Sequence, residues 1–156
     1  MSVVQSSFTI HRVYDAPVEM VFQAFADPKA KARWFARSDG GWEAAIREQD
    51  FRVGGRDRTK GVLPNGHTSD FQCEYRDIVE NERIVYVYDM FVDDRKISVS
   101  LAIVQFAREG KATRLSVTEH GAFLDGYDDA GGREHGTGLL LDQLGQSLAG
   151  ALAASA

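Results

Sequence analysis

The spacing of hydrophobic residues divides the chain into a strand, a helical part, a long run of strands and a final helix. Phe8 and Ile10 alternate with polar neighbours over residues 7–14, and this period of two predicts a strand. Apolar residues then recur at helical spacing over Pro17–Ala26, with Asp15 ahead of the proline as a helix start signal.

A second short helix is expected from Pro28 to about Phe35, because proline disfavours helix in the residue before it. From Trp42 onward the pattern is one of strands separated by turns such as Pro64-Asn65-Gly66. The predicted strands are Trp42–Glu48, Arg56–Leu63, Ser69–Val79, Arg83–Phe91, Lys96–Phe106 and Thr113–Ala122. Consecutive strands joined by tight turns predict an antiparallel meander.

Two of these strands have informative faces. In the strand Arg83–Phe91, one face carries Ile84, Tyr86, Tyr88 and Met90, and the other carries Val85 and Val87. In the strand Lys96–Phe106, Ile97, Val99, Leu101 and Ile103 alternate with Ser98 and Ser100. The step from Ile103 to Val104 breaks this alternation and is expected to mark a bulge.

The end of the chain predicts one long helix. Residues 125–132 are acidic and rich in glycine and are expected to form a loop, with the helix starting at Glu134. Its apolar stripe consists of Leu141, Leu144, Leu148 and Leu152. Only a sheet offers a surface large enough to bury this stripe. Residues 1–156 therefore form one α+β domain, a curved antiparallel sheet of about six or seven strands wrapped on the C-terminal helix.

Composition narrows the function classes. The net charge of −5 disfavours nucleic acid and anionic membrane surfaces as partners. Cys73 is the only cysteine, so no intrachain disulfide can form, which suits a reducing compartment. Met1–Ser7 lacks the features of a signal peptide, and no apolar run is long enough for a membrane span. A cytoplasmic location is expected.

Four local motifs carry a resemblance to a known family. They are Ala16-Pro17 with Val21-Phe22-Gln23-Ala24-Phe25 and Asp27-Pro28; Trp34-Phe35; Asp50-Phe51-Arg52-Val53-Gly54-Gly55; and Gly136 with Leu141-Asp142-Gln143-Leu144. In this order and spacing, the chain resembles the START-like (SRPBCC) superfamily, in the branch of the activator of heat-shock protein 90 ATPase homologue-like domains. The resemblance covers about residues 8–150.

This resemblance implies a helix-grip fold with a cavity between the sheet and the last helix. Related folds bind lipids, hormones and polyketides, and some are cyclases or aromatases. The family commonly has tryptophan right after the glycine that opens the last helix, where this chain has Thr137. The missing indole is expected to leave space in the cavity, unless Phe123 or Tyr127 fills it.

The residues expected to line this cavity come from five segments: Trp34, Phe35, Trp42, Tyr86, Tyr88, Met90, Leu115, Val117, Thr137 and Leu141. Plain core packing is the alternative for the aromatic residues among them. Glu119 is the candidate catalytic residue. It shares a strand face with Leu115 and Val117, and burial would raise the pKa of its carboxyl toward general acid–base use. The alternative is a solvated residue at the end of a strand.

Other candidates carry weaker signals. His120, Asp125, Glu134 and His135 lie near one end of the last helix, but their spacing matches no metal motif, so no metal and no cofactor are expected. Cys73 has no activating neighbour. Arg52 is expected to pair with Asp50, and Gly54-Gly55 to form a bend.

Three functions remain open. The first is binding of a small hydrophobic or amphipathic molecule in the cavity. The second is a cyclase or aromatase-type enzyme that uses Glu119 and tyrosine hydroxyls. The third is a co-chaperone-like protein-interaction module, with the acidic loops around Asp93-Asp94 and Asp125–Asp129 as its docking surface. A homodimer through the sheet or loops is a further hypothesis.

Overall fold

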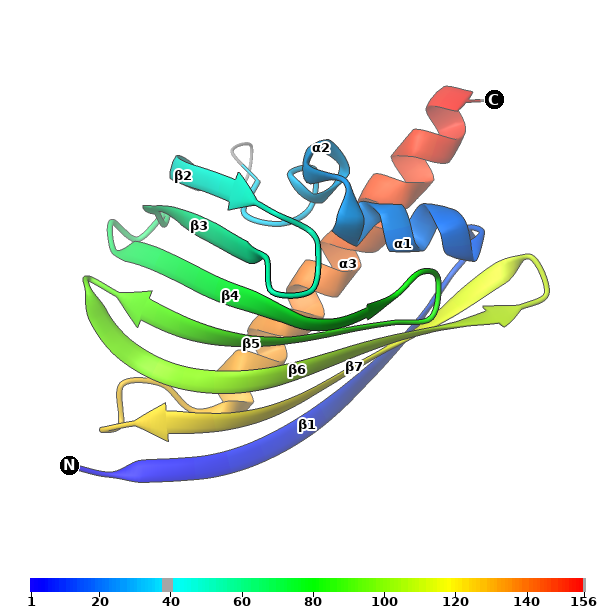
Figure 1. Cartoon of the computed structure of the whole chain (residues 1–156). Helices are drawn as coiled ribbons and strands as arrows, with labels where there is room; N and C mark the ends of the chain where they lie inside the picture. Colours follow the sequence, from blue (N-terminus) through cyan, green and yellow to red (C-terminus); the bar gives the residue numbers. More distant parts are fainter. Residues whose placement is uncertain (38–40, 156) are drawn as a thin grey trace.

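The computed structural model describes residues 1–37 and 41–155. It shows a strongly curved sheet with the helices on its inner side (Figure 1). In chain order the elements are β1 (Val3–Tyr14), α1 (Val18–Ala26), α2 (Pro28–Lys31), β2 (Glu43–Gln49), β3 (Arg56–Val62), β4 (Thr68–Val79), β5 (Arg83–Val92), β6 (Arg95–Glu109), β7 (Ala112–Leu124) and α3 (Ala130–Ser155). The predicted α+β class and the order of elements are confirmed.

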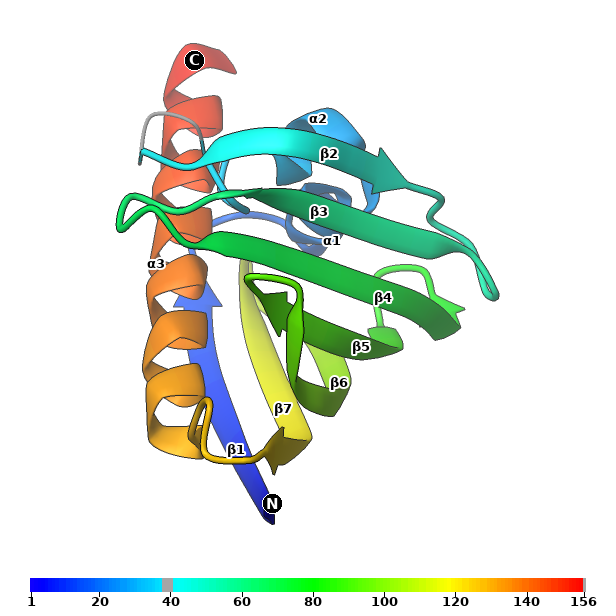
Figure 2. The ribbon, with the colours of Figure 1, turned by 90° about the vertical axis from the view of Figure 1, so that its left-hand side faces the viewer.

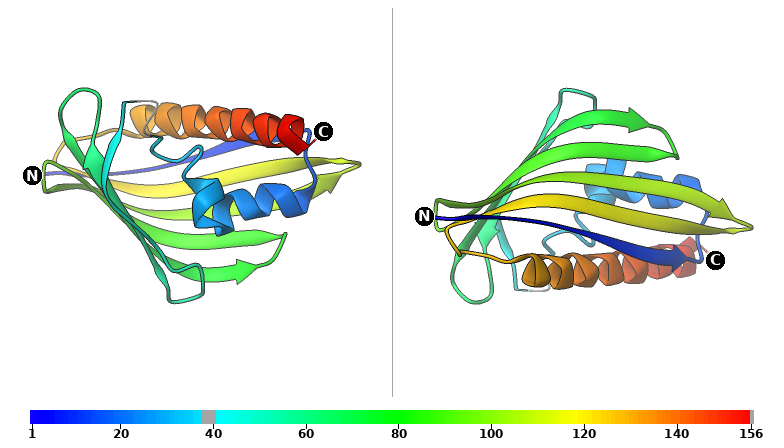
Figure 3. Two further views of the ribbon diagram at one scale, coloured as in Figure 1. Left: turned by 90° about the horizontal axis from the view of Figure 1, so that it is seen from above. Right: turned by 90° about the horizontal axis from the view of Figure 1, so that it is seen from below.

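The seven strands are all antiparallel and follow the order β1-β7-β6-β5-β4-β3-β2. Only β1 is out of sequence order, and it pairs with β7, so that Phe8 lies opposite Glu119. β1 begins at Val3, four residues earlier than expected, because its start pairs with the end of β7. Figure 2 shows the strands curling around α3, and Figure 3 shows α3 and α1 on the same side of the sheet.

The first helical part packs into the core. Pro17 caps α1, and its carbonyl oxygen accepts from the backbone N–H groups of Met20 and Val21 at 3.0 and 3.1 Å. α2 is a single turn that ends at Lys31, so the expected helix to Phe35 is shorter than predicted. The chain continues as turns, in which the N–H groups of Trp34 and Phe35 both reach the Lys31 carbonyl. These turns carry the two aromatic side chains toward the sheet.

α3 begins at Ala130, four residues before the predicted start. Three residues of its expected stripe, Leu141, Leu144 and Leu148, are buried, as predicted. Leu152 is 39% exposed, because the last turns of α3 project beyond the rest of the fold (Figure 1). The earlier start brings Arg133 into the first turns of the helix.

Close contact between α3 and β1 depends on Gly145. A Cβ atom at this position would lie 3.2 Å from the Tyr14 ring, so a larger residue would push the helix from the strand. The Tyr14 hydroxyl donates to the Leu141 carbonyl oxygen at 2.7 Å. A glycine that costs helix stability by itself is therefore offset by tertiary contact.

The expected bulge at Ile103-Val104 is wrong. Both residues pair in continuous register with β5 and with β7. The register shift lies elsewhere in β6: Met90 pairs with Ser98 and Phe91 with Lys96, so the extra residue is Ile97. From Ser98 onward the alternation in β6 is regular, and the tertiary structure decides which face is inside. Ser98, Ser100 and Ala102 face inward and are buried, whereas Val99 is 41% exposed. Ser98 in turn accepts a hydrogen bond from Arg133 of α3.

Candidate functional site

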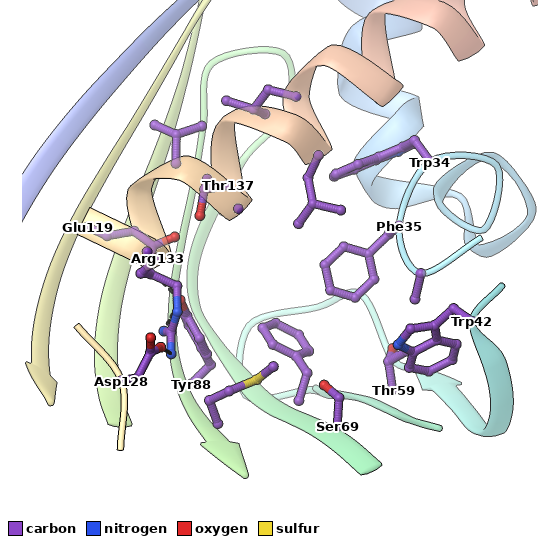
Figure 4. Close-up of a pocket in the computed structure, with 18 of the residues that line it drawn as sticks. Trp34, Phe35, Trp42, Thr59, Ser69, Tyr88, Glu119, Asp128, Arg133 and Thr137 are labelled. Atoms are coloured by element: carbon purple, nitrogen blue, oxygen red, sulfur yellow. Dashed lines mark hydrogen bonds and ion pairs between the residues drawn. The ribbon is translucent and has the colours of Figure 1, made fainter. Parts of the chain in front are cut away.

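A cavity of about 350 Å³ lies between the sheet and α3 (Figure 4). Its walls come from β3, β4, β5 and β7 on one side, from α3 on the other, and from the segment after α2. The lining residues are Phe25, Trp34, Phe35, Ala36, Trp42, Thr59, Leu63, Ser69, Phe71, Tyr86, Tyr88, Met90, Val117, Glu119, Asp128, Gly132, Arg133, Gly136, Thr137, Leu140 and Leu141. Most of this lining is apolar, and the charged groups gather at one end.

Aromatic rings in mutual contact form the apolar part. Phe71 lies 5.2 Å from Phe35 and 5.0 Å from Tyr88 between ring centroids, and Tyr86 is 5.9 Å from Tyr88. The Trp34 indole N–H donates to the Ala24 carbonyl oxygen at 2.9 Å, which fixes the ring against α1. Rings held in this way form a rigid wall for an apolar ligand.

The charged end is a connected chain of side chains under the start of α3 (Figure 4). The Tyr88 hydroxyl donates to Oε1 of Glu119 at 2.5 Å and accepts from Nη1 of Arg133 at 2.9 Å. Nη2 of Arg133 donates to Ser98 and to Asp128, both at 2.8 Å. Strands β5, β6 and β7, the loop before α3 and α3 itself therefore meet at this one group.

Glu119 is 5% exposed. Burial raises the pKa of its carboxyl, while the Tyr88 hydrogen bond and the Arg133 charge act in the opposite direction. Burial is the largest of these influences and sets the direction. Burial and the neighbouring Glu119 also raise the pKa of the Tyr88 phenol, so that phenol stays protonated. The site thus holds two groups that can carry protons next to the cavity.

The raised pKa of Glu119 predicts a pH-dependent stability. A carboxyl whose folded pKa lies above its unfolded value stabilises the fold fully below the unfolded value, and this contribution is lost as pH rises through the folded pKa. We expect Glu119→Gln to gain stability relative to the wild type as pH rises from 4.5, the ordinary value. The slope is at most about 1.4 kcal/mol per pH unit for one proton. Urea unfolding across a pH series measures it, and parallel curves for the two proteins would contradict it.

The position without the family tryptophan opens onto the cavity. Thr137 lies in the lining between Gly136 and Leu140. Neither of the two side chains considered as fillers takes the space. Phe123 is 3% exposed and packs beneath Arg133, with 5.4 Å between the guanidinium carbon and the ring centroid. Tyr127 is 47% exposed and stacks with Arg95.

Nine of the ten residues expected to line the cavity lie along it, and so does Glu119. The exception is Leu115, which is fully buried in the core and outside the lining. It shares the inward face of β7 with Val117 and Glu119, but its place on the strand is further from the cavity. A face pattern gives side-chain direction and does not give the position of a cavity along a strand. The roles of these residues in binding and of Glu119 in catalysis stay predictions.

Sequence reasoning missed Arg133 and Asp128. The predicted helix started one residue after Arg133, although Arg133, Thr137, Leu140 and Leu141 recur at helical spacing, which is the signal that identifies this face. The sequence places Asp128 in an acidic loop that is a candidate docking surface. Its carboxylate in fact turns to Arg133, and its side chain is 25% exposed. No local pattern indicates this pairing.

A second polar cluster supports the opposite wall. The Lys31 ammonium forms an ion pair with Asp57, and their side chains are 12% and 3% exposed. Tyr75 also donates to Asp57, at 3.1 Å. The ammonium lies over the rings of Phe35 and Phe71, 4.8 and 5.8 Å from their centroids. This ion pair therefore ties the end of α2 to β3, next to the cavity.

The remaining candidate residues, Cys73, Arg52 and Gly54, lie in environments that fit a structural role. Burial raises the pKa of the Cys73 thiol to about 12, which makes the thiolate scarce. Arg52 pairs with Asp50 at 2.8 Å, and Gly54 has a φ of 83°, which fits the predicted bend. Within residues 1–37 and 41–155, no group of three His, Cys, Asp or Glu side chains is placed to hold a metal.

The curved sheet, the long helix across it and the space between them define a helix-grip, START-like protein. The sequence model for the family described as "Activator of Hsp90 ATPase homolog 1-like protein" matches residues 15–149. The chain belongs to this family. In the described part of the chain, no helix has the length and hydropathy of a membrane span.

Solved structures of bacterial proteins agree with this assignment. A protein from Rhizobium leguminosarum is 39% identical, with a TM-score of 0.88, and the match covers 94% of this chain and 96% of that one. A protein from Rhizobium loti is 40% identical, with a TM-score of 0.87, and the match covers 95% and 100%. An AHSA1-like protein from Aeromonas hydrophila is 24% identical, with a TM-score of 0.71 over 94% of both chains, and shows the fold alone. A search of curated proteins gives no match.

Proposed function

We propose that the protein binds a small hydrophobic or amphipathic molecule in the cavity between the sheet and α3. The observation that carries the proposal is the cavity of about 350 Å³ with aromatic walls and a polar group at one end. Its size falls within the range of about 300–1,000 Å³ that is usual for ligand sites. Convergent polar side chains in an apolar pocket orient a ligand, whereas plain core packing leaves no such space.

Native mass spectrometry of the purified protein tests this proposal. We expect the native protein to have a mass above that of the chain alone. The extra mass should disappear under denaturing conditions, and its value gives the molecular mass of the ligand. Protein that purifies empty is titrated with methyl naphthyl ketone, an apolar aromatic probe, by isothermal calorimetry. Saturable binding of one probe per chain supports the proposal. Empty protein that also fails to bind the probe at about 1 mM, the weak end of specific affinities, contradicts it.

An acid–base enzyme of the cyclase or aromatase type is the second candidate. The observation in its favour is the hydrogen bond between Glu119 and Tyr88 at the cavity wall, since such chemistry needs two proton-carrying groups in contact with the substrate. Deuterium uptake from heavy water at the carbon beside a ketone measures this activity. It is expected in the wild type and absent in Glu119→Gln, and equal rates in both would remove Glu119 from the mechanism.

A further inference from the structure

We propose that the polar end of the cavity selects an uncharged oxygen group, a carbonyl or a hydroxyl, and rejects carboxylate and phosphate heads. This inference rests on the proposed binding function and names the chemical class of the ligand. It depends on how the hydrogen-bonding capacity of Arg133 and Glu119 is already used.

Arg133 is the only cationic side chain in the lining formed by the described residues. A guanidinium binds a carboxylate or phosphate most strongly through two parallel N–H bonds, and either such fork uses Nη2. Here both Nη2 hydrogens are taken, one by Ser98 and one by Asp128. An anionic head would have to break one of these bonds to form a fork.

The charge of Arg133 is also matched already. Asp128 lies 2.8 Å from Nη2, and the Arg133 side chain is only 12% exposed, so solvent screens this ion pair weakly. Two carboxyl groups, of Glu119 and Asp128, line the cavity beside this one cation. An added anion would therefore meet no net positive charge to compensate for its lost hydration.

Glu119 offers what an uncharged oxygen needs. Its Oε1 accepts from Tyr88, and within the described residues no ion pair joins its carboxyl to a cation. Burial raises the pKa of its carboxyl. The hydrogen bond from Tyr88 uses Oε1, so Oε2 is the oxygen that faces a ligand. The other groups around it are Arg133, whose charge lowers this pKa, and the phenols of Tyr86 and Tyr88, which are themselves kept protonated. As a carboxylate, Glu119 can accept from a ligand hydroxyl, and when it carries a proton it can donate to a carbonyl oxygen.

The rest of the cavity fixes the character of the ligand body. Thr137 stands beside the charged end (Figure 4). Phe35, Phe71 and Met90 belong to the apolar part of the same lining. Thr59 and Ser69 mark the far end. The ligand expected is a compact apolar or aromatic body with one neutral oxygen head.

Three probes of one shape test the inference by calorimetry at neutral pH: methyl naphthyl ketone, naphthoate and naphthalene. We expect the ketone to bind at least about tenfold more tightly than naphthoate, which is about 1.4 kcal/mol. The ketone should also bind more tightly than naphthalene. Naphthoate that binds as tightly as the ketone overturns the inference but leaves ligand binding standing. Failure of all three probes removes the proposed function as well.

Variants of Glu119 show whether this side chain makes the selection. Glu119→Gln keeps a donor of the same shape, so we expect it to retain the preference for ketone over naphthalene. Glu119→Leu removes the donor and should bind the two probes equally. Circular dichroism and melting temperature confirm that each variant is folded. A preference for ketone that survives in Glu119→Leu overturns the assignment to Glu119.

Discussion

Replacing Thr137 by tryptophan is expected to weaken ligand binding strongly. The residue lines the cavity, and nothing else in the described lining fills the place of the family indole. A ring at this position would take up space in the cavity next to its charged end, where Thr137 lies. We expect the affinity for methyl naphthyl ketone to fall by about a hundredfold, which is about 2.7 kcal/mol. Calorimetric titration of the variant measures this loss.

Leu139→Trp is the matched control. It places the same indole on the same helix, but Leu139 is 50% exposed and lies outside the lining. This variant should bind the probe like the wild type. Equal loss of binding in both variants would mean that the indole disturbs α3 as a whole. Unchanged binding in Thr137→Trp would place the ligand elsewhere.

Replacing Asp57 by alanine is expected to lower the free energy of unfolding by several kcal/mol. The change leaves the Lys31 ammonium buried without its partner, and it also removes the acceptor of the Tyr75 hydroxyl. Breaking a buried ion pair in this way typically costs about 3–5 kcal/mol. For a chain of this length the melting temperature should fall by on the order of 10 °C. Urea unfolding and calorimetry measure the two quantities.

The double variant Lys31→Met/Asp57→Ala separates the lost charge pair from the lost side chain. Removing both charges leaves no unpaired ammonium, so the double variant should be clearly more stable than Asp57→Ala alone. A cost below about 1 kcal/mol for Asp57→Ala would show that water screens the pair as at a surface. In that case the position of α2 beside β3 would need another explanation.

Local patterns predicted the elements well where backbone geometry sets the period. Side chains of successive strand residues point to opposite faces, so the sequence could place Tyr86, Tyr88 and Met90 on one side of β5. The same rule put Val117 and Glu119 together on β7. The turn at Pro64-Asn65-Gly66 was predictable for a similar reason, since Gly66 adopts positive φ at low cost.

Element ends were less predictable, because tertiary contacts set them. β1 extends to Val3 only because β7 offers a partner there. α3 starts at Ala130 although three glycines lie in its first two turns. Packing and the Arg133 contacts with the sheet compensate for that low helix propensity. The error in the helix start is also what hid Arg133 from the list of site residues.

By itself, the sequence determined the order of elements, the family and the inward face of β5 and β7, because these depend on short-range periodicity and on local motifs. Only the tertiary structure decided the chemistry at the end of the cavity. Tyr88 and Glu119 are 31 positions apart, and Arg133 is 45 positions from Tyr88. Contacts of this separation depend on how the sheet curves around α3. That curvature brings Tyr88, Glu119 and Arg133 into one hydrogen-bonded group, in which both hydrogens of Nη2 of Arg133 are already used.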